Sequence, residues 1–276
     1  MSIQNVFQKQ FNLKLSLGLK SEKPNFFVFN ALSAFAAMLF FVSASGFKLS
    51  FNTEFLWYSF FFAVSYSTAI TGLIFSIYYG SLSLTALITS YSLVIPTLFG
   101  IVFLKEEIGI YIYIGIFLLM VSLFLVNAKN EKIVVSPKWF LWITVAFIGN
   151  GMTSVVQKLQ QTAMSGMYKY EFMIVALGIT TVIMYLISLT DFKSIKGTFK
   201  SAKILASLNG IANGATNLQV IFLTGILPAS VLFPSISAGG IIITFLLSQF
   251  VYCEHLSKTQ LIGVTFGTLS VILMNI

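Results

Sequence analysis

The residues best suited to chemistry are three asparagines in the segment LASLNGIANGATNLQV. Asn209, Asn213 and Asn217 recur at every fourth position, so on a helix their side chains lie along one face. A carboxamide both donates and accepts hydrogen bonds, which suits a neutral or zwitterionic polar solute. Asparagines in membrane helices also bond neighbouring helices, so a structural role competes with a cavity-lining one. Three amides in one stripe favour the cavity-lining role, and we expect them to line a substrate cavity.

Other polar residues lie on matching faces or where apolar runs end. Ser65 and Gly72 share one face of AVSYSTAITGLIF. The Ser65 hydroxyl could instead bond its own backbone one turn back, and the two roles are equally favoured. Gln157 and Lys158, in the segment GMTSVVQKLQQT, end the apolar run 139–158. A lysine at the end of a membrane helix usually extends to the lipid headgroups, and a role in a gate is the alternative. Together with the asparagines, Ser65, Gly72 and Gln157 are the predicted substrate contacts.

Small residues, prolines and glutamates at the ends of runs form a second group. Two pairs of glycines are spaced four apart, which lets helices approach closely. Prolines inside apolar runs kink a helix and free carbonyl groups. Glutamates at matched positions next to loops favour a role in helix-turn geometry. The predicted structural and gating positions are Glu106, Glu254, Pro96, Gly210, Gly214, Gly263 and Gly267.

Catalysis and metal binding find little support in the sequence. The single cysteine and single histidine, Cys253 and His255, are far fewer than a closed metal site needs. An enzyme would need a nucleophile and a base together, and the phosphate-binding pattern GxxxxGK[ST] does not occur. We therefore expect no catalytic residue, no metal and no cofactor.

The composition indicates which elements must position these residues. Hydrophobic residues make up 57% of the 276 residues and charged residues only 9%. A soluble domain has about 25% charged residues, so most of this chain must lie in lipid. The formal net charge is +8, but the lysines lie between apolar runs, which indicates membrane topology and no nucleic-acid partner. We expect a monomeric integral protein of a bacterial plasma membrane, whose partners are the bilayer and a small-molecule substrate.

Nine apolar runs are long enough to cross a bilayer, which takes about 20 residues per helix. They are uninterrupted, unlike the alternating strands of an outer-membrane barrel, so the expected fold class is all-α. Short polar links such as KNEKIVVSPK and DFKSIKGTFK separate them. The runs cover residues 26–46, 55–77, 82–104, 109–127, 139–158, 171–190, 203–223, 229–251 and 257–276.

The chain also matches itself. A shift of 148 residues aligns Glu106 with Glu254 and Gly115 with Gly263, and a shift of 149 aligns Gln8 and Lys9 with Gln157 and Lys158. The opening MSIQNVFQKQ therefore corresponds to the end of the run 139–158. We predict ten helices in two repeats of five, residues 1–127 and 128–276, with the first helix truncated. The expected cause is a true start upstream of Met1, and the alternative is a shortened protein.

An odd number of helices per repeat makes the two repeats cross the membrane in opposite senses. Inverted repeats of this kind are the architecture of secondary transporters, whose substrate site lies near the midplane where the halves meet. The repeat therefore predicts a carrier that works by alternating access. A channel is less favoured, because an oligomeric pore needs no inverted repeat within one chain.

The segment ITSYSLVIPTLFGIVFLKEEIGIYIYIGIFLLMVSLFLVN resembles the fourth and fifth helices of an EamA-type repeat of the drug/metabolite transporter superfamily. The resemblance rests on Pro96, Glu106 and Gly115, and the second copy keeps Glu254 and Gly263 but has Thr244 at the proline position. It covers nearly the whole chain. It implies a ten-helix carrier of small metabolites or drugs, and both chain ends in the cytoplasm.

Every Asp and Glu lies in a loop or at the end of a predicted run, as Glu171 does at the start of the run 171–190, which favours a facilitator or exchanger over a pump with a buried proton relay. The alternatives are a multidrug exporter of lipophilic cations and, less favoured, a non-transporting membrane protein or a membrane enzyme. Twelve of the 16 lysines fall on one predicted side, which would place the C-terminus outside. This orientation is opposite to the one that the resemblance implies.

Overall fold

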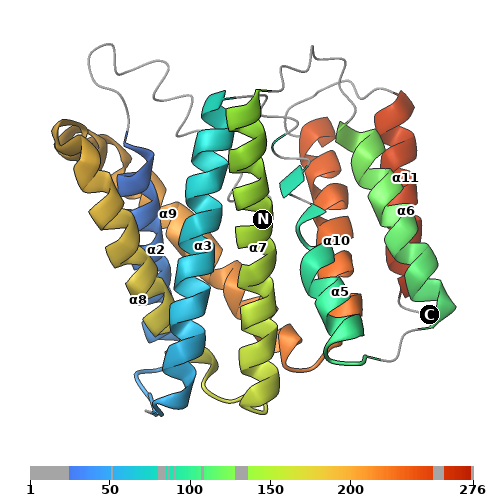
Figure 1. Ribbon diagram of the computed structural model, residues 1–276, viewed down its shortest axis with the longest axis horizontal. Coiled ribbons are helices and arrows are strands. Elements are labelled where there is room, and N and C mark those ends of the chain that lie inside the picture. The colour runs from blue at the N-terminus through green and yellow to red at the C-terminus, as the bar shows by residue number, and fades with distance from the viewer. Residues whose placement is uncertain are drawn as a thin grey trace. The chain divides into compact units, whose positions relative to one another are not determined.

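The computed structural model describes residues 25–50, 52–79, 85, 88–89, 91–106, 109–127, 136–250 and 258–274. Regular structure in this part of the chain is helical, without strands, which confirms the all-α class (Figure 1). The helices are α2 (Phe26–Ala44), α3 (Glu54–Tyr79), α5 (Val94–Val102), α6 (Ile110–Asn127), α7 (Pro137–Ala163), α8 (Lys169–Ser188), η1 (Leu189–Asp191), α9 (Phe192–Thr224), α10 (Ala229–Phe250) and α11 (Lys258–Met274).

Each of the nine predicted runs overlaps one of these α-helices, and the predicted half-helix before residue 25 lies outside the described residues. One boundary differs clearly from the prediction. The segment DFKSIKGTFK was predicted as a polar link, yet all of it beyond Asp191 belongs to α9. Lysine is a good helix former, so a polar composition without proline did not interrupt the helix.

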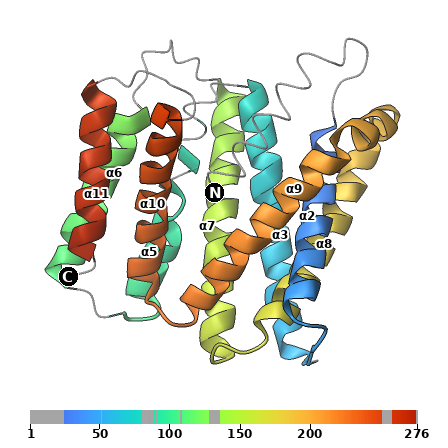
Figure 2. The same ribbon diagram turned by 180° about the vertical axis from the view of Figure 1, so that it is seen from behind.

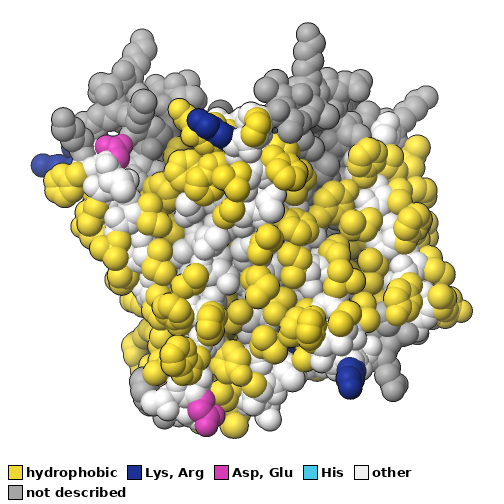
Figure 3. Space-filling model, in the orientation of Figure 1, with side chains coloured by type: hydrophobic (Ala, Val, Ile, Leu, Met, Phe, Trp, Pro, Cys, Tyr) yellow, Lys and Arg dark blue, Asp and Glu magenta, His cyan; other side chains and the backbone are white. Residues whose placement is uncertain are grey.

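Four segments are long and apolar enough to cross a membrane: Phe26–Ala44, Glu54–Tyr79, Pro137–Ala163 and Lys169–Asp191. Shorter apolar stretches are Ile110–Ser122 and Leu261–Ser270. On the face shown in Figure 3, hydrophobic side chains follow the helices along their length, and Lys, Asp and Glu side chains lie near helix ends. These features fit a membrane protein. The asparagines of α9 lower the hydropathy of that helix.

The chain divides into two compact units. The first unit comprises residues 1–67 and 159–225, and the second comprises residues 68–158 and 226–276. Each unit therefore draws helices from both predicted sequence repeats. The helices α3 and α7 each contribute residues to both units.

In the first unit, α2 packs against α8 and α9, as both views show (Figures 1 and 2). Asn25 caps α2, because its Oδ1 accepts from the backbone N–H of Phe27 (3.1 Å) and Val28 (3.2 Å). Its Nδ2 donates to the Ser188 carbonyl at 3.0 Å, which joins the start of α2 to the end of α8. Phe29 is buried against Ala202, Leu205 and Ala206 of α9.

In the second unit, α6 lies beside α11, and α10 contacts α5, α6 and α11. The Ser122 hydroxyl donates to the Gly263 carbonyl at 2.6 Å across the α6–α11 contact. Trp139 of α7 is 3% exposed, and its Nε1 donates to Thr85 Oγ1 at 3.1 Å. The buried polar groups of Ser122 and Trp139 therefore have hydrogen-bond partners on neighbouring segments of the chain.

Candidate functional site

The first amide of the predicted stripe lies in the α2–α9 contact. Asn209 is 7% exposed, and its Nδ2 donates to Ser33 Oγ at 3.2 Å. The Ser33 hydroxyl donates its only proton to the Ala206 carbonyl at 3.0 Å. Ser33 can therefore only accept from Asn209, which fixes the orientation of the amide. Asn209 Oδ1 is left buried without a hydrogen-bond partner.

The other two amides form a half-buried network with a tyrosine. Asn213 Nδ2 donates to the Tyr66 hydroxyl at 2.9 Å, and Tyr66 lies near the middle of α3. Asn217 Nδ2 donates to Asn213 Oδ1 at 2.5 Å and to the Asn213 carbonyl at 3.0 Å. We call these three residues, Tyr66, Asn213 and Asn217, the amide–tyrosine network. All of it belongs to the first unit, and it remains partly accessible.

Three of the singled-out glycines mark close helix contacts. A Cβ on Gly210 would lie 2.7 Å from Ala36 Cβ and 3.1 Å from the Ala37 nitrogen of α2. A Cβ on Gly214 would lie 2.6 Å from the Phe40 ring. Gly72, predicted as a substrate contact, faces the backbone of α7, where a Cβ would come within 2.6 Å of the Ala146 nitrogen. In this structure Gly72 is therefore a packing position.

Glu106 lies in a buried charged cluster of the second unit. Its Oε1 accepts from the Ala229 N–H at 2.7 Å, and its Oε2 accepts from the Ser230 N–H at 2.9 Å and the Ser230 hydroxyl at 2.8 Å. The carboxylate thus caps the N-terminus of α10, where the helix dipole favours a negative charge. Lys158 Nζ lies 3.7 Å from Oε1, and the two side chains are only 10% and 12% exposed.

Lys158 also contacts the segment that leads into α10. Its Nζ donates to the Leu227 carbonyl at 2.7 Å. We call Glu106, Lys158 and the start of α10 at Ala229 and Ser230 the charged cluster. The sequence predicted a role of Glu106 in helix-turn geometry, but the helix that it caps is distant in the chain.

The remaining predicted positions lie elsewhere. Gln157 is 3% exposed and its Nε2 has no hydrogen-bond partner. Ser65 is half-buried in α3, and Pro96 is buried in α5. In α11, the Gly263 carbonyl accepts from Ser122, and the Gly267 carbonyl accepts from Ser270 at 2.9 Å. Glu254 lies outside the described residues.

Two polar residues of the apolar helices were not predicted from the sequence. Tyr66 is next to Ser65, which was singled out instead. Asn150 of α7 donates to Ser92 Oγ at 2.6 Å within the second unit. The signal for Asn150 was present, because an asparagine between two glycines interrupts the apolar run WITVAFIGNG.

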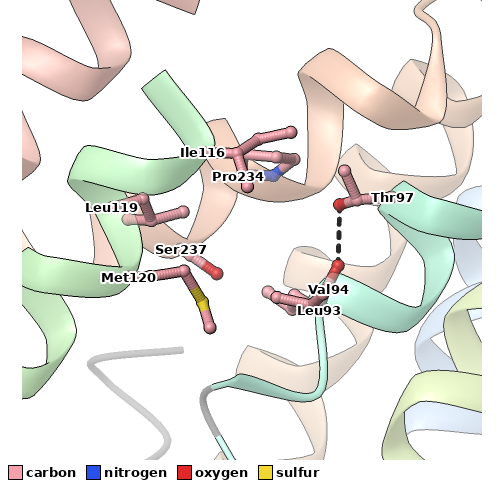
Figure 4. Close-up of a pocket in the computed structure, with 8 residues that line it drawn as sticks. All are labelled: Leu93, Val94, Thr97, Ile116, Leu119, Met120, Pro234 and Ser237. Atoms are coloured by element: carbon pink, nitrogen blue, oxygen red, sulfur yellow. Dashed lines mark hydrogen bonds between the residues drawn. The ribbon is translucent and has the colours of Figure 1, made fainter. Parts of the chain in front are cut away.

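A small cavity lies between α5, α6 and α10 of the second unit (Figure 4). Its lining side chains, which include Leu93, Met120 and Pro234, are mostly apolar, and the Thr97 hydroxyl is bonded to the Leu93 carbonyl at 2.8 Å. The cavity volume is about 10 Å³, which is enough for about one water molecule. A drug-sized ligand needs about 300–1,000 Å³, so this cavity is no substrate site.

In the described part of the chain, no group of three or more His, Cys, Asp and Glu side chains could hold a metal ion.

Comparison with known proteins shows a similarity of fold to a solved structure. No protein-family model and no curated protein matches the chain. A solved structure described only as "Crystal structure of protein" matches with a TM-score of 0.72 at 10% sequence identity. The match covers 100% of this chain and 99% of that one. The chain therefore shares its fold with that solved structure along its full length.

Proposed function

We propose that the chain is a secondary membrane carrier of the drug/metabolite transporter type, an EamA-like protein with ten helices in two inverted repeats. It moves a small polar solute by alternating access and acts as a facilitator or exchanger. The amide–tyrosine network contacts the solute. Asn209 contributes mainly by holding α9 against α2.

The observation that carries this proposal is the half-buried position of Asn213, Tyr66 and Asn217 on helices of otherwise apolar character. Polar groups are costly in lipid and mark substrate pathways when they face an interior. The Tyr66 hydroxyl accepts from Asn213, which leaves its proton for another acceptor. The internal repeat of the sequence supports the same architecture. The buried carboxylate of Glu106 is engaged by Lys158 and α10, which favours a carrier without a free proton relay.

A thermal-shift screen of the purified protein tests the proposal. The panel contains amino acids, nucleosides, sugars, polyamines and lipophilic cations. We expect a neutral or zwitterionic solute to raise the melting temperature, and Asn213→Ala or Asn217→Ala to weaken its binding about tenfold, as expected for one lost hydrogen bond of about 1.4 kcal/mol.

Thr216→Ala is the matched control. Thr216 is half-buried on the same helix, but its hydroxyl donates to the Ala212 carbonyl of its own helix at 2.9 Å. This variant should bind the solute like the wild type. Stabilisation by lipophilic cations alone, equal in the wild type and both asparagine variants, would indicate a drug exporter and would refute the assigned site.

A further inference from the structure

The charged cluster joins three segments of the second unit that are far apart in sequence. Glu106 follows α5, Lys158 belongs to α7, and Ala229 and Ser230 begin α10. The carboxylate accepts three hydrogen bonds from α10 and lies 3.7 Å from the Lys158 ammonium group. A carboxylate in such a position is held by charge-assisted bonds, which are stronger than bonds between neutral groups.

A glycine of α5, Gly100, faces this carboxylate. A Cβ on Gly100 of α5 would lie 2.6 Å from Glu106 Oε2 and 2.9 Å from the Ala229 Cβ. The absence of a side chain at position 100 therefore allows the carboxylate and the start of α10 to approach α5. The groups that surround the carboxylate are the N–H groups of Ala229 and Ser230, the Ser230 hydroxyl and the Lys158 ammonium group.

The cluster lies next to two of the places where the chain passes between the units. These passages are after Ser67, after Lys158 and after Gly225. Lys158 is the last residue before one passage, and its bond partner Leu227 is the second residue after another. The Lys158–Leu227 hydrogen bond therefore joins two points of the chain that are next to these passages.

We propose that Glu106 and Lys158 form a releasable latch of the transport cycle, which this chain closes by placing its own carboxylate at the N-terminus of α10. The inference rests on the proposed carrier function, because alternating access requires one end of the carrier to open and close. In the closed state the latch covers Ala229, which is 0% exposed. Release of the latch uncovers Ala229 and the segment before it.

Cysteine accessibility tests the latch without any substrate. The background carries Cys253→Ser, and Ala229→Cys is the reporter for a membrane-impermeant maleimide. We expect Glu106→Gln to increase the labelling rate about tenfold, which corresponds to a shift of about 1.4 kcal/mol in the latch equilibrium. Lys158→Gln should increase it less, because the three bonds from α10 to Glu106 remain. Should Glu106→Gln fail to fold, Lys158→Gln still carries the test.

Two controls separate a latch from general destabilisation. Glu171→Gln removes an exposed carboxylate that accepts from the Ser50 N–H (2.8 Å) and hydroxyl (3.1 Å) in the first unit, and it should not change labelling. Gly210→Ala destabilises the α2–α9 contact without touching the cluster and should also leave labelling unchanged. Equal acceleration by Gly210→Ala and Glu106→Gln would overturn the proposal, as would an unchanged rate in both cluster variants.

Chemical rescue provides a readout that a merely structural glutamate would not give. Glu106→Ala should label fast, and sodium acetate, which can occupy the emptied carboxylate position, should slow it again. Acetamide has the same shape but no charge and should have no effect. Rescue without detectable solute binding in the thermal-shift screen would uphold the latch and reject the solute site. Equal effects of acetate and acetamide, or none from either, would refute the latch.

Discussion

The amide–tyrosine network of the first unit and the charged cluster of the second solve the same problem in different ways. Both place polar side chains among apolar helices. The network uses neutral groups that stay half-buried; Asn213 Nδ2 donates only to Tyr66 among the described residues, and its second hydrogen atom remains for another acceptor. The cluster uses full charges that are only 10% and 12% exposed and that are bonded on several sides.

The difference indicates how easily each region can rearrange. Hydrogen bonds between helices in lipid contribute only about 0.6 kcal/mol on average, so the network can exchange an internal partner for a solute at little cost. Removal of one partner from a buried ion pair costs about 3–5 kcal/mol. The network is therefore suited to binding, and the cluster is suited to holding one conformation until both partners move together.

The largest effect should come from removal of one partner in the cluster. Glu106→Ala should lower the free energy of unfolding by about 3 kcal/mol, because it leaves Lys158 buried and the start of α10 uncapped. The measurement is unfolding by dodecyl sulfate titration in mixed micelles. Lys158→Met alone should be destabilising too, and the double variant should be less destabilised than the sum of both, by about 1 kcal/mol or more. Additive losses would show that the pair does not interact.

A smaller effect is expected where helix packing alone is disturbed. Gly210→Ala should lower the free energy of unfolding by about 1–3 kcal/mol, because the new methyl group would overlap α2 near Ala36. Gly178→Ala is the matched control in the same unit, since its Cβ would meet only the Met38 sulfur at 3.4 Å. In the same titration the control should be neutral or slightly stabilising, because alanine favours a helix over glycine by about 1 kcal/mol. Equal losses in both variants would contradict the close contact at Gly210.

These two cases also show what the sequence could predict. Gly210 and Gly214 were placed in a helix contact from their spacing alone, because small residues four apart form one narrow strip on a helix. The nine α-helices of the described residues followed from the apolar runs, since a run of about 20 residues has few other stable forms in lipid. Both features depend on residues that are close in the chain.

The partners of the polar residues depend on distant segments and could not be predicted. Glu106 and Ala229 are 123 positions apart, and no local pattern specifies that the one caps the helix begun by the other. Tyr66 and Asn213 are 147 positions apart, and no spacing pattern in the sequence identifies Tyr66 as the hydrogen-bond partner of Asn213. Gly72 was grouped with the substrate contacts, although it faces the backbone of α7.

The smallest effect on stability should come from the amide–tyrosine network, and it sharpens the comparison best. Tyr66→Phe keeps the ring and removes only the hydroxyl that accepts from Asn213. Since such a bond contributes about 0.6 kcal/mol in lipid, the free energy of unfolding should fall by less than about 1 kcal/mol. Binding of the solute found in the thermal-shift screen should weaken about tenfold, because the Tyr66 hydroxyl no longer donates a hydrogen bond to the solute.

The neighbouring Phe62 provides the control variant Phe62→Tyr, which adds a hydroxyl at a buried position; the ring centroids of Phe62 and Tyr66 are 5.8 Å apart. That variant should lose stability and keep its intrinsic affinity. A Tyr66→Phe protein with reduced stability and unchanged affinity would make the network a structural bond between α3 and α9, like the one between Asn209 and Ser33.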